Sequence, residues 1–225
     1  MVEKSDKSVY NKFTKNGGVT MADHHVITIA RGYGSGGKTM GKMLAEELGW
    51  SYYDRDLLQL AADESGISEE LFAKADETAR KSRLFRIAKD VFDGKVIPPD
   101  RDDFISNENL FRYQAKIIRR LAASENCVIV GRCANYILKD EPHVLKVYIH
   151  APRKVCIRTV MSMFGLTNQE AEKRIQEIDK RRGDYYKYFT GRDWQCADDY
   201  DLCIDSSRMS WEQCISIVRA YLDNL

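Results

Sequence analysis

The chain is poor in the residues that mark metal, disulfide and membrane proteins. Its 225 residues include only 4 histidines, without metal-ligand spacing, and 6 cysteines, with no CxxC pair. The sequence therefore predicts no zinc site and no disulfide framework, and reduced thiols are typical of a cytoplasmic protein. Because no run of about 18 apolar residues is present, we expect no membrane-spanning segment.

Net charge is also small. The chain has 35 lysines and arginines against 34 aspartates and glutamates, which gives a net charge of +1. This balance argues against a protein that binds nucleic acid through its overall charge. The 44% of hydrophobic and 31% of charged residues indicate a globular chain rather than a disordered one.

The pattern of apolar segments predicts one α/β domain behind a tail. Residues 1–23 lack the apolar core of a secretory signal and carry acidic side chains, so we expect them to be disordered. Residues 24–225 have the length of one domain, in which short β-branched runs alternate with segments of helical period. This order is typical of a five-stranded parallel sheet covered by helices. Strands are expected at 26–30, 50–53, 127–131, 144–151 and 202–205.

Two further features describe the helices. Residues 56–123 show helical periods without a strand between them, so we expect a helical insert there. Thr167 with Glu170, and Ser210 with Gln213, match the capping box that opens a helix. Each pair predicts the first turn of a helix.

The segment between the first strand and the first helix matches the phosphate-binding pattern GxxxxGK(S/T). Glycine allows positive φ and brings backbone N–H groups around a phosphate, while the helix N-terminus adds partial positive charge. Lys38 is expected to reach the β- and γ-phosphate oxygens, and the hydroxyl of Thr39 to bind Mg²⁺. The predicted cofactors are ATP and Mg²⁺, and the expected phosphate-binding residues are Gly32, Gly34, Ser35, Gly36, Gly37, Lys38 and Thr39.

Charged residues follow the second and third expected strands. Asp54, Arg55 and Asp56 come directly after the second strand, and Arg132 follows the third. Ligands of doubly wound sheets bind beyond the carboxyl ends of the strands, so we expect these side chains near the phosphate loop. Asp54 can hold Mg²⁺ through a bound water, or an acceptor hydroxyl, and the two arginines can hold an acceptor phosphate. Alternatively, Asp54 or Asp56 caps the helix that begins at Leu57, and Arg132 forms a surface ion pair.

An apolar helical stripe in the last third of the chain ends in an arginine. Ala171, Ile175 and Ile178 recur at helical spacing, and the next position of the stripe is occupied by Arg182. The guanidinium of Arg182 is therefore expected to point inward. Arg181 adds a second positive charge beside it.

The basic segment around these arginines suggests a lid. We expect residues 179–193 to form a mobile flap, with Gly183 and Gly191 as hinges, that excludes water and stabilises the charge of a transferred phosphoryl group. The alternative is a solvated run in which the basic side chains pair with neighbouring aspartates, Asp179, Asp184 and Asp193.

Four segments within residues 26–225 carry a resemblance to a known family: ITIARGYGSGGKTMGKMLAEELGWSYYDRDLL, VIVGRCANYI, YIHAPRKVCIRTVM and DYDLCIDSSRMSWEQCISIV. In these segments and their order the chain resembles the cytidylate kinase-like family of P-loop kinases. The resemblance implies a five-stranded parallel sheet, a helical insert that binds a nucleoside monophosphate, and an arginine-bearing lid. By position it makes residues 32–39 the phosphate loop, Arg132 the acceptor arginine, and the stretch around Arg181 and Arg182 the lid.

We therefore expect an ATP- and Mg²⁺-dependent kinase of a small molecule, with CMP or dCMP as the acceptor. Lys38, Arg181 and Arg182 are the expected catalytic residues, because phosphoryl transfer depends mainly on positioning and on neutralising charge. No covalent intermediate with the protein is required.

Two alternatives remain. The pair of aspartates at 54 and 56 also resembles the pattern of shikimate kinases, in which a hydroxyl and Mg²⁺ are held, so a non-nucleotide hydroxyl acceptor is possible. Val130 and Cys133 flank Gly131 and Arg132 without supplying an acid. The absence of an acid at these positions weakens the case for a catalytic base. The second alternative is therefore a regulator that binds a nucleotide and transfers nothing.

Overall fold

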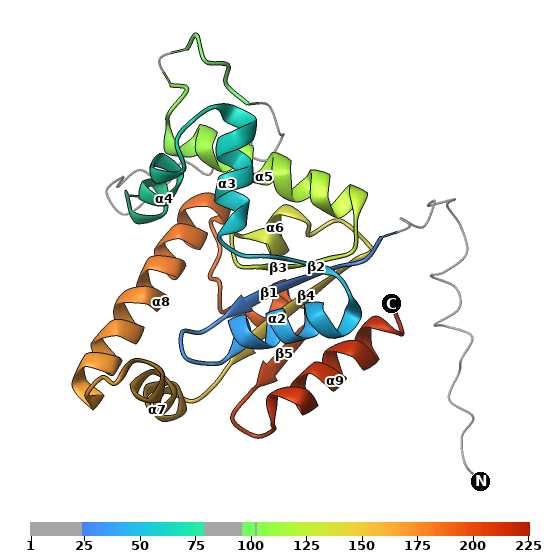
Figure 1. Cartoon of the computed structure of the whole chain (residues 1–225), viewed down its shortest axis with the longest axis vertical. Coiled ribbons are helices and arrows are strands. Elements are labelled where there is room, and N and C mark those ends of the chain that lie inside the picture. The colour runs from blue at the N-terminus through green and yellow to red at the C-terminus, as the bar shows by residue number, and fades with distance from the viewer. Residues whose placement is uncertain (1–23, 79–95, 102) are drawn as a thin grey trace.

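A five-stranded parallel sheet forms the centre of the molecule (Figure 1). The computed structural model describes residues 24–78, 96–101 and 103–225. The strand order is β2-β3-β1-β4-β5, and all neighbouring strands are parallel, which confirms the expected α/β fold. The strands are β1 (Val26–Arg31), β2 (Ser51–Tyr53), β3 (Cys127–Val130), β4 (Val144–His150) and β5 (Leu202–Asp205).

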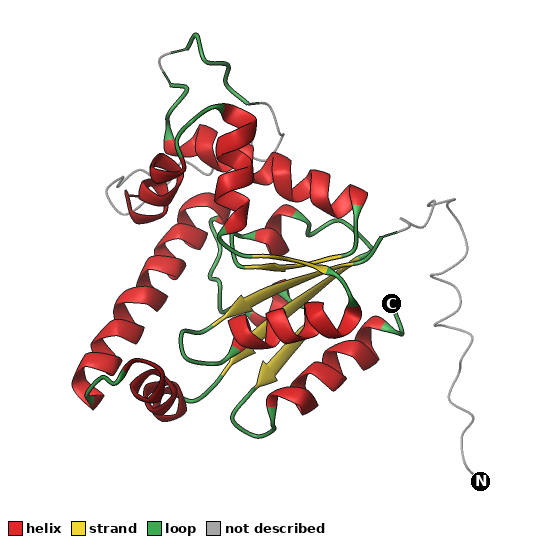
Figure 2. Cartoon of the chain, viewed as in Figure 1, coloured by secondary structure: helices red, strands yellow, loops and turns green. Residues whose placement is uncertain are grey.

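Helices connect the strands and lie on both faces of the sheet (Figure 2). The expected tail and part of the expected insert lie outside the described residues. Among the helices that are described, none combines the length and the apolar character needed to cross a membrane. They are α2 (Gly37–Leu48), α3 (Asp56–Ser65), α4 (Glu69–Thr78), α5 (Asn107–Ser124), α6 (Ala134–Ile137), α7 (Arg153–Phe164), α8 (Asn168–Thr190), the 3₁₀-helix η2 (Ala197–Asp199) and α9 (Trp211–Leu222).

The sheet separates two apolar cores, because parallel strands covered by helices are buried on both faces. On one face, Ile27 and Ile29 of β1 pack with Leu44 of α2 and with α9. On the other face, Val26 joins a larger core formed by α3, α5, α6 and the C-terminal half of α8. A third and smaller core fills the space between α7 and α8. The second and third of these cores include residues of α8 and hold that helix beside the carboxyl ends of the strands.

Both predicted capping boxes are present. The hydroxyl of Thr167 accepts a hydrogen bond from the N–H of Glu170 at the start of α8, and the Glu170 carboxylate accepts one from the N–H of Thr167. Ser210 and Gln213 make the same reciprocal pair at the start of α9. These local signals determine where the two helices begin.

The segment expected to form a hinged lid is largely one long helix. α8 has 23 residues, so Gly183 lies inside it rather than at a break. A Cβ atom at Gly183 would lie 3.0 Å from the indole nitrogen of Trp194, so this glycine lets the indole approach the helix backbone. Gly191 ends α8 with a φ of +71°. Of the two expected hinges, only Gly191 lies where the helix ends, and closure of a lid stays a prediction.

Aromatic rings join α5 to α8. Phe111 of α5 is fully buried, and its ring stacks on that of Phe189 with the ring centroids 4.0 Å apart. Tyr185 packs against both rings. Because α5 belongs to the expected insert and α8 carries the two predicted catalytic arginines, this cluster sets the position of the arginines relative to the insert.

We expect Phe111→Ala to lower the free energy of unfolding by about 3–5 kcal/mol, the cost typical of truncating a buried phenylalanine. Urea unfolding followed by circular dichroism measures this change. The control is Ile105→Ala, at a side chain that is 57% exposed, where we expect less than about 0.5 kcal/mol. Equal effects at the two positions would contradict the packing assigned to Phe111.

Candidate functional site

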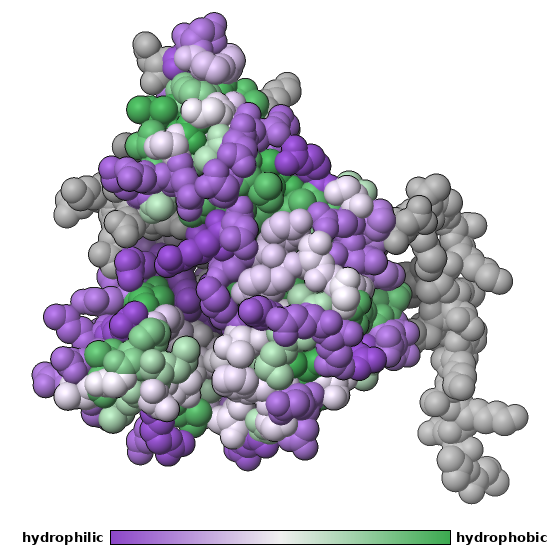
Figure 3. Space-filling model, viewed as in Figure 1, coloured by the Kyte–Doolittle hydropathy of each residue, from purple (hydrophilic) through white to green (hydrophobic). Residues whose placement is uncertain are grey.

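A cavity of about 780 Å³ lies beyond the carboxyl ends of β1, β2 and β3. Figure 3 shows hydrophilic side chains gathered around the hollow between α3 and α8. The sheet topology explains this position, since parallel strands deliver the residues that follow them to one edge. Positive charge dominates the lining, with three carboxylates, Asp54, Glu69 and Glu177, among seven basic side chains, Arg31, Lys38, Arg55, Arg132, Arg174, Arg181 and Arg182.

The phosphate loop has the backbone that its sequence predicted. Gly34 and Gly36 have φ values of +86° and +83°, a region that favours glycine. A Cβ atom on Gly34 would lie 2.8 Å from the carbonyl oxygen of Cys156, so no other residue fits between the loop and α7. α2 begins at Gly37, and the N–H groups of its first turn have no partner within the helix. Such a helix start is suited to binding an anion.

Three of the predicted phosphate-binding residues, Ser35, Thr39 and Gly32, differ in their surroundings. The Ser35 hydroxyl is buried and donates to the carbonyl oxygens of Gly32 and Ile149, at 2.9 and 3.1 Å, so it stabilises the loop itself. Thr39 is half-buried on the first turn of α2. Gly32 lines a second cavity, of about 430 Å³, behind the loop.

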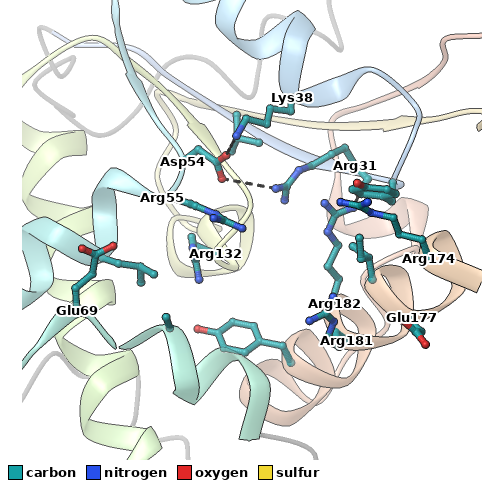
Figure 4. Close-up of a pocket in the computed structure, with 16 residues that line it drawn as sticks. Arg31, Lys38, Asp54, Arg55, Glu69, Arg132, Arg174, Glu177, Arg181 and Arg182 are labelled. Carbon is teal, nitrogen blue, oxygen red and sulfur yellow. Dashed lines mark hydrogen bonds and ion pairs between the residues drawn. The ribbon is translucent and has the colours of Figure 1, made fainter. Parts of the chain in front are cut away.

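Lys38 and Asp54 form an ion pair in the main cavity. Lys38 Nζ lies 2.7 Å from Asp54 Oδ2, and Arg31 Nη2 lies 3.7 Å from Asp54 Oδ1 (Figure 4). Burial by itself would raise the pKa of Asp54. The hydrogen bond from Lys38 and the charges of Arg31, Lys38 and Arg132 outweigh burial and lower that pKa below its ordinary value. Asp54 therefore stays ionised and holds Lys38 at the mouth of the loop.

Arg31 belongs to the site although the sequence analysis did not select it. It is the last residue of β1, and burial, together with the charge of Arg182, lowers its pKa to about 9, while Asp54 opposes the shift. A Cβ atom at Gly131 would lie only 2.3 Å from Arg31 Nη1. A charged residue at the end of an apolar strand, directly before the phosphate loop, was the available signal.

The turn after β3 has an unusual backbone. Gly131, Arg132 and Cys133 all have positive φ values, +83°, +59° and +55°. Arg132 lines the cavity, and burial lowers its pKa while the charges of Tyr185 and Asp54 oppose the shift. Cys133 is buried, which raises the pKa of its thiol, and it does not line the cavity. Strained backbone of this kind is found at binding sites, where the surrounding structure maintains it.

Of the three charged residues after β2, two line the cavity and one does not. Asp54 and Arg55 line the cavity, and Figure 4 shows Arg55 close to Arg132. Asp56 lies outside the lining, on the first turn of α3, where a carboxylate interacts favourably with the helix dipole. α4 contributes Glu69, which the sequence analysis did not select.

α8 places Arg181 and Arg182 in the cavity wall. Arg182 Nη1 donates to the backbone oxygen of Arg31, at 3.1 Å, and to Asp179 Oδ1, at 3.2 Å. The inward direction expected from the helical stripe is thus the one Arg182 takes. Its ion pair with Asp179 also matches one part of the alternative, in which basic side chains pair with neighbouring aspartates. The structure therefore contains both an inward arginine and this pair.

Residues 26–208 match the family model described as the cytidylate kinase-like family. The chain belongs to this family. It is 32% identical over 210 residues to a cytidylate kinase from Methanopyrus kandleri, a match that covers 89% of this chain and 94% of the relative. The cytidylate kinase from Pyrococcus horikoshii is 28% identical over 204 residues, covering 90% and 91%. This family member is therefore a kinase of a nucleotide or another small molecule.

Two solved structures share the fold. An uncharacterised protein from Eubacterium ventriosum superposes with a TM-score of 0.65 at 24% identity, covering 90% of this kinase and 100% of that chain. A gluconokinase from Sinorhizobium meliloti gives a TM-score of 0.50 at 16% identity, covering 89% and 92%. At these identities the likeness concerns the fold alone.

We expect Asp54→Asn to lower the free energy of unfolding of this kinase by about 1.5–3 kcal/mol near neutral pH, because Arg31 loses a charged partner. The pKa of Asp54 is below its ordinary value of 3.8 in the folded chain, so its contribution is complete well above that value and is lost as the pH falls through the folded pKa. The difference between wild type and variant should therefore shrink as the pH falls below about 5. Urea unfolding at several pH values measures it.

Asp140→Asn, at a side chain that is 88% exposed, is the control and should have little effect at any pH. A difference between wild type and Asp54→Asn that stays constant or grows on acidification would contradict the ionised state assigned to Asp54.

Proposed function

We propose that this chain transfers the γ-phosphoryl group of ATP, in the presence of Mg²⁺, to a nucleoside monophosphate of the cytidylate type. The observation that carries the proposal is the arrangement of cations in one cavity. Arg55 and Arg132 lie beside Asp54 and Lys38 at the end of the phosphate loop, and Arg174, Arg181 and Arg182 of α8 lie across the open space from them (Figure 4). A kinase of a monophosphate needs two anion sites of this kind within one cavity.

The residues act by position and charge. Lys38 would leave Asp54 to bind the β- and γ-phosphate oxygens, and Arg182 would neutralise the charge that spreads over the transferred group. Arg55 and Arg132 would hold the acceptor phosphate, with Arg181 adding charge nearby. The monophosphate oxygen then attacks in line, the bond between the β–γ bridging oxygen and the γ-phosphorus breaks, and ADP leaves.

The residues present fit a magnesium ion that arrives with the nucleotide. Mg²⁺ is bound by a few protein oxygens together with phosphates and waters. Thr39, on the first turn of α2, supplies a hydroxyl, and Asp54 supplies an ionised carboxylate beside Lys38. Within residues 24–78, 96–101 and 103–225, no three His, Cys, Asp or Glu side chains gather as a metal site of their own. When bound, the ion would neutralise phosphate charge.

The geometry favours a phosphate acceptor over a plain hydroxyl acceptor. A hydroxyl kinase of the kind considered from the sequence would use both Asp54 and Asp56. Only one of these two carboxylates is in the site, because Asp54 lines the cavity and Asp56 lies outside its lining. Two arginines on the acceptor side suit a doubly charged phosphate.

We expect purified protein to release ADP from Mg·ATP with CMP or dCMP, and more slowly or not at all with UMP, AMP, GMP or shikimate. Lys38→Ala should lower kcat by about a hundredfold or more, because one charged donor to the transferred group is lost. A coupled assay measures turnover, and circular dichroism verifies that the variant is folded. An active Lys38→Ala protein would refute the role of Lys38, and turnover with shikimate alone would replace the proposed acceptor.

Arg132→Met should raise KM for the acceptor about tenfold or more and change KM for ATP little, because a charge-assisted hydrogen bond contributes about 1.5–3 kcal/mol. Initial rates with each substrate varied in turn separate the two constants. Arg219→Met, which removes the same group from an exposed position of α9, is the matched control. A rise in KM for ATP alone would place Arg132 on the donor side.

A further inference from the structure

Asp179 of α8 connects the phosphate loop to the lid arginine. Its Oδ1 accepts a hydrogen bond from the backbone N–H of Tyr33, at 2.8 Å, and another from Arg182 Nη1, at 3.2 Å. Tyr33 is the second residue of the phosphate loop and lies 146 positions away in the sequence. One carboxylate oxygen therefore holds both partners at a fixed separation.

The side chain of Tyr33 strengthens the same connection. The guanidinium carbons of Arg182 and Arg174 lie 5.5 and 6.0 Å from the centroid of its ring. These distances are typical of cation–π contacts. The ring also packs against the small core between α7 and α8. The phosphate loop is thus attached to α8 through a backbone hydrogen bond, an aromatic ring and an apolar core.

Asp179 also offsets the repulsion between Arg31 and Arg182. Arg31 and Arg182 are close enough that the charge of Arg182 helps to lower the pKa of Arg31, after burial itself. Each arginine has its own carboxylate, Asp54 for Arg31 and Asp179 for Arg182. Without Asp179, burial and repulsion would both favour a rotamer that moves the Arg182 guanidinium out toward water.

The hydrogen bonds of Arg182 suit a group that is held ready for a ligand. Both of its bonds to described residues use Nη1, one to Asp179 and one to the carbonyl of Arg31. The donors on Nη2 are left for a phosphate oxygen in the cavity that Arg182 lines.

We propose that Asp179 is a positioning residue, which holds Arg182 against the phosphate loop so that its guanidinium faces the transferred phosphoryl group when the triphosphate binds. This inference rests on the proposed function. Asp179 acts through Arg182 and does not itself line the main cavity. It converts a flexible arginine into a preorganised one, and preorganised charge is the main means by which a protein accelerates phosphoryl transfer.

A double-mutant cycle tests the proposal, with kcat and KM for ATP measured in wild type, Asp179→Ala, Arg182→Ala and the double variant. We expect Arg182→Ala to lower kcat by about a hundredfold or more and Asp179→Ala by about tenfold or more. The double variant should lie within about threefold of Arg182→Ala, because Asp179 has nothing left to position. Glu172→Ala, which removes an exposed carboxylate from the same helix, should leave kcat unchanged.

Multiplicative effects in the cycle would overturn the proposal, since Asp179 would then act independently of Arg182. A rise in kcat on Asp179→Ala would also overturn it, because Asp179 would then be withholding Arg182 from the ligand. If Asp179→Ala fails to fold, Asp179→Asn takes its place, since the amide oxygen can still accept from Tyr33 while the charge is lost. With Asn, a loss of kcat that occurs when Arg182 is present but not in the Arg182→Ala background supports the proposal, whereas an equal loss in both backgrounds overturns it.

The failure of the proposed function has a different signature. A wild-type protein that releases no ADP with any nucleoside monophosphate would overturn the proposed function, and this inference with it, before any variant is compared. If the wild type is active and the effects of Asp179→Ala and Arg182→Ala on kcat multiply in the double variant, the role of Asp179 is overturned and the proposed function stands.

Discussion

The concentration of positive charge at the carboxyl ends of the strands is the constraint on which the rest of the site depends. Arg31, Lys38 and Arg132 come from three neighbouring segments of the fold and share one cavity. The Arg31 side chain is also largely removed from water, and a buried cation close to other cations is costly unless it has a partner. Asp54 meets this need for Arg31 and Lys38 at once, with distances of 3.7 and 2.7 Å. Its position after β2 therefore holds the site together.

The strand order brings these groups together. β3 lies between β2 and β1, and Tyr53 and Thr28 both align with Ile129 of β3. The residues that follow each strand consequently emerge side by side, which puts Asp54 opposite the end of β1. The backbone then adapts locally, with three successive positive φ values after β3. Gly131 is needed there because a side chain would occupy the space of the Arg31 guanidinium.

Much of this arrangement could be predicted from the sequence, and the part that could not has a common cause. The strands, the phosphate loop and the two capping boxes depend on residues close together in the chain, so their patterns are readable. Arg31 has ordinary local surroundings, and its role comes from Asp54 and Arg182, which are not its sequence neighbours. The pairing of Asp179 with Arg182 is local and was among the expected alternatives, but the bond of Asp179 to Tyr33 joins positions 146 residues apart. Asp56 shows the reverse case, since its spacing from Asp54 suggested a shared site and the start of α3 turns it away from the cavity. Gly183 resembles a hinge in sequence, but Trp194 gives it a packing role.

The pKa of Arg31 is lowered to about 9, which reflects the free-energy cost of burying its charge on folding. Burial and the nearby Arg182 both disfavour its charge, and Asp54 compensates only in part. A phosphate entering the cavity would supply the missing negative charge, so it would meet cations that have already lost their water. The reorganisation normally required to desolvate and orient such groups is completed during folding, and a phosphate gains the full electrostatic interaction without it. The same argument explains why the site needs Asp54 and Asp179, which hold the cations in place before a phosphate binds.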